Sequence, residues 1–204
     1  MKKYFAALSA TALISLAPYA LATDTLTVTG TITPAACLPS LSGGGMIDVG
    51  KIRAKDLNQT TETQIGSHPI QLTVACDAPI PIALNPIDNK PGTATNPAYF
   101  GLGETNALEN LGGFYTAILA TQADGVMAEP IFSDDGGTSW SSTSSVTPGE
   151  LLSVASLADH STPIEVAMLT LGLEIRPMIA RADSLTLTDD VTLDGSVTFE
   201  VKYL

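Results

Sequence analysis

Alternation of apolar and polar side chains recurs along this 204-residue chain and constrains its fold more than any other feature. The clearest run lies near the amino terminus. There Leu26, Val28 and Ile32 share one face, threonines occupy the other, and Gly30 interrupts the apolar side. A period of two is the pattern of a β-strand with one buried face. We interpret this run as an exposed, strand-forming arm whose apolar face needs a partner surface.

The amino terminus has the features of a secretory signal peptide. Two lysines precede an apolar stretch over residues 4–16, and Ala20-Leu21-Ala22 supplies a small-x-small cleavage site. The apolar stretch falls short of the ~20 residues that a membrane-spanning helix needs. We therefore expect residues 1–22 to be removed and the mature, exported chain to begin at Thr23.

The chain is acidic, with 21 Asp and Glu, nine Lys and Arg, and a formal net charge of −12. Nucleic acids and anionic membranes bind basic surfaces, so we expect neither as a partner. The acidity favours solubility and would also suit a basic partner surface. About 180 mature residues are enough for one domain with a hydrophobic core.

The chain has two cysteines, Cys37 and Cys76. An even number of cysteines in an exported chain favours a disulfide over a metal site or catalysis. A redox-active cysteine is the alternative, but neither residue belongs to a Cys-x-x-Cys motif. We expect one disulfide between them.

Most of the remaining chain has strand character. Clusters of Gly, Pro, Asn and Asp, including Asp77-Ala78-Pro79 and Asn85-Pro86, separate the apolar or alternating runs. Many short strands at roughly regular spacing predict an all-β sandwich. Residues 54–61 and 103–110 are the candidates for a helical turn or two, and 151–157 is ambiguous. The predicted strands lie at residues 70–76, 80–84, 114–121, 164–175 and 191–203.

No set of residues in the sequence forms a recognisable catalytic or metal-binding motif. His68 and His160 each lack further ligands at a spacing that zinc would need. Asp189, Asp190 and Asp194 could offer oxygen ligands to calcium, although a solvated turn explains them as well. There is no nucleophile elbow and no phosphate-binding glycine loop. We expect no enzymatic activity, no metal and no cofactor.

A second local motif lies in the middle of the chain. Ser133, Asp135, Gly137 and Trp140 match the Asp-box pattern of sialidases and other β-propellers. The box occurs once, in a chain too short for a propeller, so we interpret it as a hairpin braced by its own side chains. An exposed Trp140 could instead stack on a sugar ring.

The two ends of the chain together resemble a chaperone–usher fimbrial subunit, or pilin. The features that carry this resemblance are the arm Leu26–Ile32, Ala35-Ala36-Cys37, the second cysteine Cys76, and the alternating carboxyl-terminal run that ends in the penultimate Tyr203. The segments 31–34, 42–45, 73–78 and 133–140 are similar to a fimbrial-type family of otherwise undefined function. The sequence departs from the pilin pattern at Val191, where pilins often have a glycine; the nearest glycine is Gly195.

This resemblance implies an immunoglobulin-like β-sandwich that lacks its last strand and therefore exposes an apolar groove. A periplasmic chaperone would fill the groove first, and the arm of the next subunit would replace it at an outer-membrane usher by donor-strand exchange. The implied domains are a signal peptide (1–22), a donor-strand arm (23–36) and a pilin-like domain (37–204). The implied site residues are the donor-strand positions Leu26, Val28, Gly30 and Ile32, and the groove-edge and chaperone-binding positions Val197, Phe199, Val201, Tyr203 and Leu204.

We therefore expect a structural subunit of a surface fimbrium, exported through the periplasm, that polymerises with neighbouring subunits and supports cell adhesion. One alternative is an adhesin-like module that binds glycans through loops such as 100–115 or through Trp140. A more remote alternative is a secreted hydrolase whose catalytic residues are brought together only by the fold.

Overall fold

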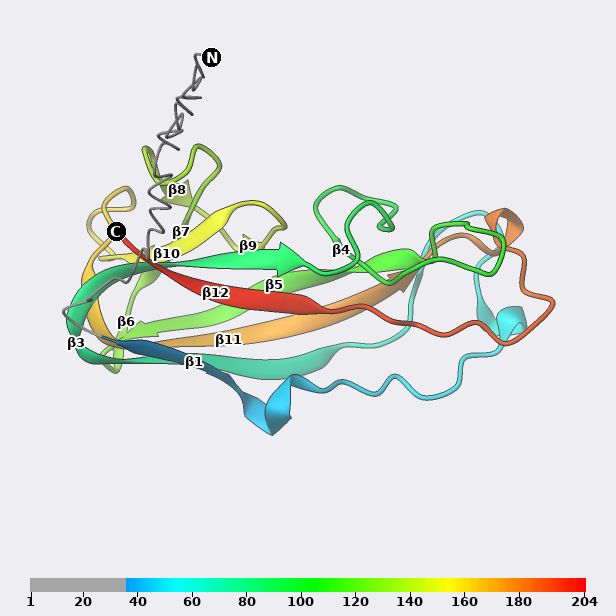
Figure 1. Cartoon of the computed structure of the whole chain (residues 1–204), viewed down its shortest axis with the longest axis horizontal. Helices are drawn as coiled ribbons and strands as arrows, with labels where there is room; N and C mark the ends of the chain where they lie inside the picture. Colours follow the sequence, from blue (N-terminus) through cyan, green and yellow to red (C-terminus); the bar gives the residue numbers. More distant parts are fainter. Residues whose placement is uncertain (1–35) are drawn as a thin grey trace, which may run out of the picture. The chain divides into compact units, whose positions relative to one another are not determined.

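A computed structural model describes residues 36–204 (Figure 1). The predicted signal peptide (1–22) and the donor-strand positions Leu26–Ile32 lie outside the described residues and stay predictions. Within residues 36–204, no helix is long and apolar enough to cross a lipid bilayer.

The described residues form β-strands and three short 3₁₀ turns, with no α-helix among them. The all-β prediction is confirmed. The 3₁₀ turns are Ser42–Gly45, Ala54–Asp56 and Ala182–Ser184. The strands are β1 (Cys37–Leu41), β2 (Thr63–Gln64), β3 (His68–Asp88), β4 (Phe100–Gly101), β5 (Gly112–Ala123), β6 (Val126–Met127), β7 (Glu129–Ser133), β8 (Ser141–Ser142), β9 (Ser145–Val146), β10 (Leu151–Ala155), β11 (Glu165–Ile179) and β12 (Val197–Tyr203).

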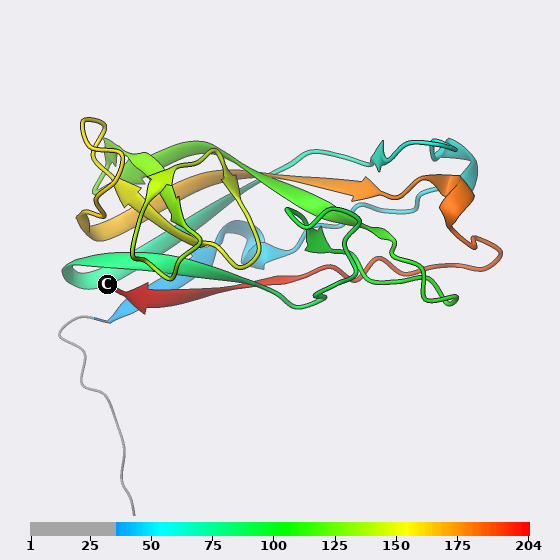
Figure 2. The ribbon, with the colours of Figure 1, turned by 90° about the horizontal axis from the view of Figure 1, so that it is seen from above.

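The strands form two antiparallel layers that share one long strand, β3. The first half of β3 pairs with β1 on one side and β11 on the other, and β5 follows β11. The second half of β3 pairs with β12 and, at one position, with β10, which continues to β7 and β8. Figures 1 and 2 show β3 turning from one layer into the other. This arrangement is the predicted β-sandwich.

The sequence predicted two strands separated by a turn at Asp77-Ala78-Pro79, and this prediction is wrong. β3 runs continuously from His68 to Asp88 and bends instead. Pro79 and Pro81 lack the N–H that a ladder needs, and the pairing with β11 shifts register at this place. Prolines at the change of layer therefore bend the strand without ending it.

Other element boundaries also differ from the predictions. Pro86, predicted in a turn, lies inside β3 opposite Phe199. The ambiguous segment 151–157 is a strand, β10, over Leu151–Ala155. Residues 103–110 form no helix but a tight loop closed by a bridge between Glu104 and Asn110. The carboxyl-terminal strand begins at Val197, and the residues before it have no strand partner among those described.

The core lies between the two layers. Side chains of β3 and β11 from one layer meet those of β3 and β10 from the other, which fixes the inward face of each strand. Alternation along the strands is what the sequence pattern required. The buried side chains include Leu72, Val74, Ile82, Leu84, Leu152, Val154, Leu169, Leu171 and Leu173.

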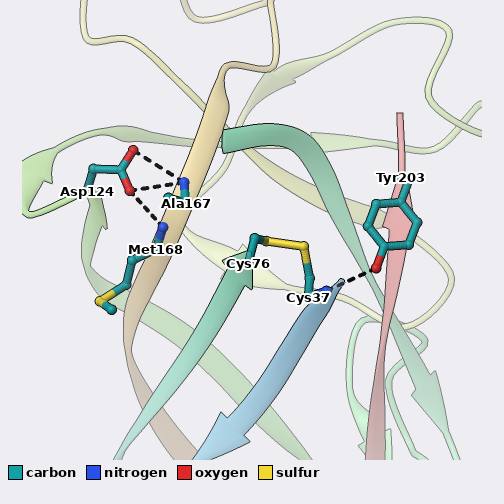
Figure 3. The surroundings of a disulfide bond; sticks show 6 residues. All are labelled: Cys37, Cys76, Asp124, Ala167, Met168 and Tyr203. Carbon is teal, nitrogen blue, oxygen red and sulfur yellow. Dashed lines mark hydrogen bonds between the residues drawn. A yellow bond between two sulfur atoms is a disulfide. The ribbon is translucent and has the colours of Figure 1, made fainter. Parts of the chain in front are cut away.

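A disulfide between Cys37 and Cys76 joins β1 to β3 beside the bend, as predicted (Figure 3). The backbone N–H of Cys37 also donates to the hydroxyl of Tyr203 at 3.1 Å, which ties β1 to β12. On the far side of β3, the Asp124 carboxylate accepts from the N–H groups of Ala167 and Met168 at 3.0 and 2.7 Å. The two hydrogen bonds to Asp124 stabilise β11 where its pairing with β3 changes register, between Val166 and Met168.

Replacing both cysteines by alanine should lower the free energy of unfolding substantially. The disulfide closes a loop with a sequence separation of 39, for which the chain-entropy model gives about 4 kcal/mol. Urea unfolding of the double variant and of the oxidised parent measures the difference. The reduced parent is the control, and it should unfold near the variant. An unfolding midpoint equal to that of the oxidised parent would contradict the prediction.

Candidate functional site

An apolar groove lies along one side of the sandwich, between β1 with the segment that follows it and β12 with the segment that leads into it. β1 and β12 flank successive halves of β3 and, within the described residues, pair with no other strand. Figure 2 shows β1 (blue) and β12 (red) next to each other on this side. The groove contains a cavity of about 220 Å³, and its lining includes Leu41, Ile47, Val49, Phe114, Ile175, Leu193, Val197 and Phe199.

Two stretches of backbone without regular secondary structure border the groove and have no ladder partner. Residues 46–52 and 187–193 make no backbone–backbone hydrogen bond to any other described residue. The Gly50 N–H donates to the Asp48 carboxylate at 2.8 Å. The remaining backbone groups of these stretches could bond an additional strand, as at an open sheet edge. The groove therefore offers both parts of a strand-binding site, which are apolar pockets and unpaired backbone.

The structure places the predicted groove-edge residues along β12. Val197 and Phe199 line the cavity, and Val201 is half-buried against the core. The hydroxyl of Tyr203 accepts the hydrogen bond from Cys37, so Tyr203 stands where β1 and β12 meet and the groove ends. The backbone N–H of Leu204 donates to the Pro81 carbonyl at 3.1 Å, and 47% of Leu204 stays exposed.

Gly195 has a structural reason to be glycine. A Cβ atom there would lie 2.9 Å from the carbonyl oxygen of Gly101 and 2.7 Å from the side chain of Leu102. The neighbouring Asp194 N–H donates to the Leu102 carbonyl at 3.1 Å. The lead-in to β12 thus crosses β4 at close range. Val191, which stands where pilins often have glycine, is half-buried against the core.

Sequence reasoning missed the opposite wall of the groove. Ile47 and Val49 line the cavity from a segment without regular secondary structure. Their alternation was visible, but the preceding Gly43-Gly44-Gly45 suggested only a loop. All three glycines have a positive φ, and together they turn the chain at the end of β1.

The carboxylate of Glu109 holds the segment that precedes β12 in place. Glu109 accepts from the Thr186 N–H at 2.5 Å, the Thr186 hydroxyl at 2.9 Å and the Thr105 hydroxyl at 2.9 Å. These hydrogen bonds, first that of the Thr186 backbone, lower the pKa of Glu109. Further along, Lys90 and Asp194 form an ion pair. The 103–110 loop thereby positions the segment that enters the groove wall.

The hairpin after β7 is braced in the way the sequence suggested. The Asp135 carboxylate accepts from the Ser139 hydroxyl at 2.6 Å, the Ser139 N–H at 3.0 Å and the Ser133 hydroxyl at 2.7 Å. These bonds, led by that of the Ser139 hydroxyl, hold the pKa of Asp135 well below its usual range. Trp140 is half-buried and donates its indole N–H to the Gly137 carbonyl at 3.2 Å.

The other sequence candidates do not come together. His160 lies 3.6 Å from the Glu129 carboxylate, in a different part of the chain from His68 at the start of β3. Within residues 36–204, no group of three or more His, Cys, Asp or Glu residues could hold a metal ion. Phe100, in the loop proposed for glycans, is buried and stacks on Phe114 with a centroid distance of 5.1 Å.

Known proteins are similar to this chain at low identity. A family described as "Protein of unknown function (DUF1120)" matches residues 26–105, a segment that contains β1, β3 and both cysteines. Protein GltF of Escherichia coli K12 is 26% identical over 251 aligned positions that cover 100% of this chain and 99% of GltF. Uncharacterized protein YhcF of the same organism is 24% identical over 220 positions, covering 85% of this chain and 87% of YhcF.

Replacing Asp135 by Asn should destabilise the protein near neutral pH and less so in acid. A carboxylate with a lowered folded-state pKa stabilises the fold above its unfolded pKa, about 3.9, and loses this effect as the pH falls. The difference in melting temperature between Asp135→Asn and the parent should therefore shrink below about pH 4. The exposed neighbour Asp134 supplies the control, since Asp134→Asn should follow the parent. A pH-independent difference for Asp135→Asn would argue against the brace.

Proposed function

We propose that this protein is a structural subunit of a surface fimbrium that polymerises by donor-strand exchange and supports cell adhesion. The observation that carries the proposal is the apolar groove bordered by β12 and by residues 46–52. An amino-terminal arm with matching alternation precedes the first described strand in the sequence. The arm of one subunit would occupy the groove of the next and complete an immunoglobulin-like sandwich.

The free energies involved indicate that binding of the arm needs both side-chain and backbone contacts. Burying Leu26, Val28 and Ile32 is worth about 1.5–3 kcal/mol each. Ordering each residue of the arm costs about 1–2 kcal/mol. The three side chains together supply about 4.5–9 kcal/mol, which over most of these ranges is less than the cost of ordering seven residues, about 7–14 kcal/mol. Hydrogen bonds to the unpaired edges on both sides of the groove supply the remaining stabilisation, which is why the open backbone matters as much as the apolar cavity.

The same groove explains the need for further partners. An unfilled apolar groove with open edges favours aggregation. A periplasmic chaperone would cover it until an outer-membrane usher brings the next subunit. The exposed end of the chain at Leu204 is the natural point of attachment for the chaperone. Gly30 would leave one position of the groove shallow, and an incoming arm could begin displacement there. The role is one of assembly, without catalysis.

The arm can be tested with two neighbouring substitutions of the same kind. Val28→Asp puts a charge on the apolar face, whereas Thr27→Asp puts it on the opposite face. Val28→Asp, like deletion of residues 23–33, should abolish fibres on the cell surface and leave the subunit in the periplasm. Thr27→Asp should assemble as the parent does. Electron microscopy of cells and fractionation of the periplasm are the measurements. Normal fibres from the deletion variant would overturn the proposal.

The groove can be tested in the same way from the acceptor side. Val197 lines the cavity, and its neighbour Thr198 is exposed on the other face of β12. Val197→Asp should block entry of the arm and lower fibre yield at least as much as Val28→Asp, because a buried unpaired charge is costly. Thr198→Asp should keep most of the yield. A melting curve on each periplasmic form separates blocked assembly from unfolding, and equal yields for both variants would contradict the role of the groove.

A further inference from the structure

The outer face of the β1–β3–β11–β5 layer, away from the groove, carries a surface without charge. Leu38, Ala75 and Met168 lie opposite one another on neighbouring strands and form its first row. Leu38 is 73% exposed and Met168 50% exposed. On β3 and β11, the sequence neighbours Val74 and Leu169 are buried in the core, so Ala75 and Met168 point to the opposite, solvent-facing side.

Two further rows continue this surface along the strands. Ser40, Thr73, Thr170 and Gln122 form the second row. Gln71, Gly172 and Ala120 form the third. No Asp, Glu, Lys or Arg is among these residues, although the chain has 21 acidic residues. Asp124 stands at the β5 end of the first row, where its carboxylate accepts from the N–H groups of Ala167 and Met168. Charged side chains thus border the rows at both ends, with Asp124 beside the first row and the Glu174–Arg176 ion pair beyond the third. We call the three rows the uncharged face.

The uncharged face has a projecting side chain beside a depression. The pairing of β5 with β11 is irregular between Gly172 and Leu173, and the extra residue, Leu119, is 61% exposed. Next to it is an open hollow of about 500 Å³, lined by Gly172, Gln71, Thr170 and Leu119 itself. A projection and a hollow on one surface are self-complementary. Two copies related by a two-fold axis can each place Leu119 in the hollow of the other.

We propose that the uncharged face is a contact between two copies of this chain. The distribution of charge favours a second copy as the partner. Each copy is strongly acidic, and its acidic surfaces repel those of another copy. Two copies meet the least repulsion where the facing surfaces carry few charged side chains. Depletion of charged side chains with exposed Met and Leu is also the composition of interface cores. Threonine, serine and glutamine can form hydrogen bonds across such a contact.

The area of the face indicates how strong the contact between two copies is. Four strands at a spacing of about 4.8 Å and three rows spaced about 6.6 Å apart give about 400 Å² per copy. That area is at the weak end of specific interfaces. Single copies would pair weakly, but copies repeated along a fibre would pair strongly through multivalency. The inference thus extends the proposed function, on which its fibre readout rests, to side-by-side association of fibres.

The test uses two substitutions on the face and one outside it. Leu119→Gln replaces the apolar projection by a polar side chain of similar size. Gly172→Val fills the hollow without a clash, since a Cβ atom there meets Ala120 at an ordinary 3.5 Å. Leu157→Gln changes an exposed leucine of a loop and is the control. Electron microscopy should show paired fibres for the parent and Leu157→Gln, and single fibres of equal length for Leu119→Gln and Gly172→Val.

A second readout does not depend on fibres. The periplasmic form of the Val28→Asp chain should self-associate in sedimentation equilibrium, and Leu119→Gln or Gly172→Val should raise its dissociation constant at least about tenfold. Added salt should strengthen the association, because it screens the repulsion between acidic copies, whereas a basic partner would be weakened.

Failure of this inference and failure of the proposed function give different results. Fibres from Val28→Asp would overturn donor-strand exchange while leaving the pairing of fibres to be scored. Loss of fibres in Val28→Asp, with equal pairing by the parent, Leu119→Gln and Gly172→Val, would overturn the uncharged face alone. Absence of any self-association in the parent, as fibres or as the periplasmic form, would overturn it as well.

Discussion

The pairing of β3 with four other strands is the constraint on which the rest of the structure depends. Its first half lies between β1 and β11, and its second half between β12 and β10. Because one continuous strand serves both layers, its two edge partners, β1 and β12, come to lie on the same side of the sandwich. The groove is a direct consequence of the bend in β3. A turn between two separate strands would not fix that geometry.

The disulfide and Tyr203 act at the same bend. Cys37 is bonded to Cys76 of β3 through sulfur and to Tyr203 of β12 through its backbone N–H. The start of β1 is therefore held to both layers, while the continuation of β1 and the lead-in to β12 diverge and leave the cavity between them.

Local patterns predicted individual strands well and their connections less well. Alternation over 197–203 gave both β12 and the face of Val197 and Phe199, because a period of two needs only neighbouring residues. The even cysteine count gave the disulfide. Pro79 and Pro86 misled, since prolines favour turns locally, but pairing on both sides of β3 outweighs that preference. Ile47 and Val49 could not be assigned to the groove, because their place depends on a wall formed by residues about 150 positions away.

The edge strands of this protein differ from those of an ordinary β-sandwich in length and in side chains. The outer strands β4 and β8 have two residues each, and such short edges offer little to an incoming chain. β12 has seven residues; its charged side chains, Glu200 and Lys202, are exposed, whereas Val197 and Phe199 line the groove and Val201 packs against the core. A lysine on the inner face would be enough to discourage pairing. An apolar, extended edge beside unpaired backbone is costly for a solitary monomer, so we infer that this edge exists to be covered by another strand.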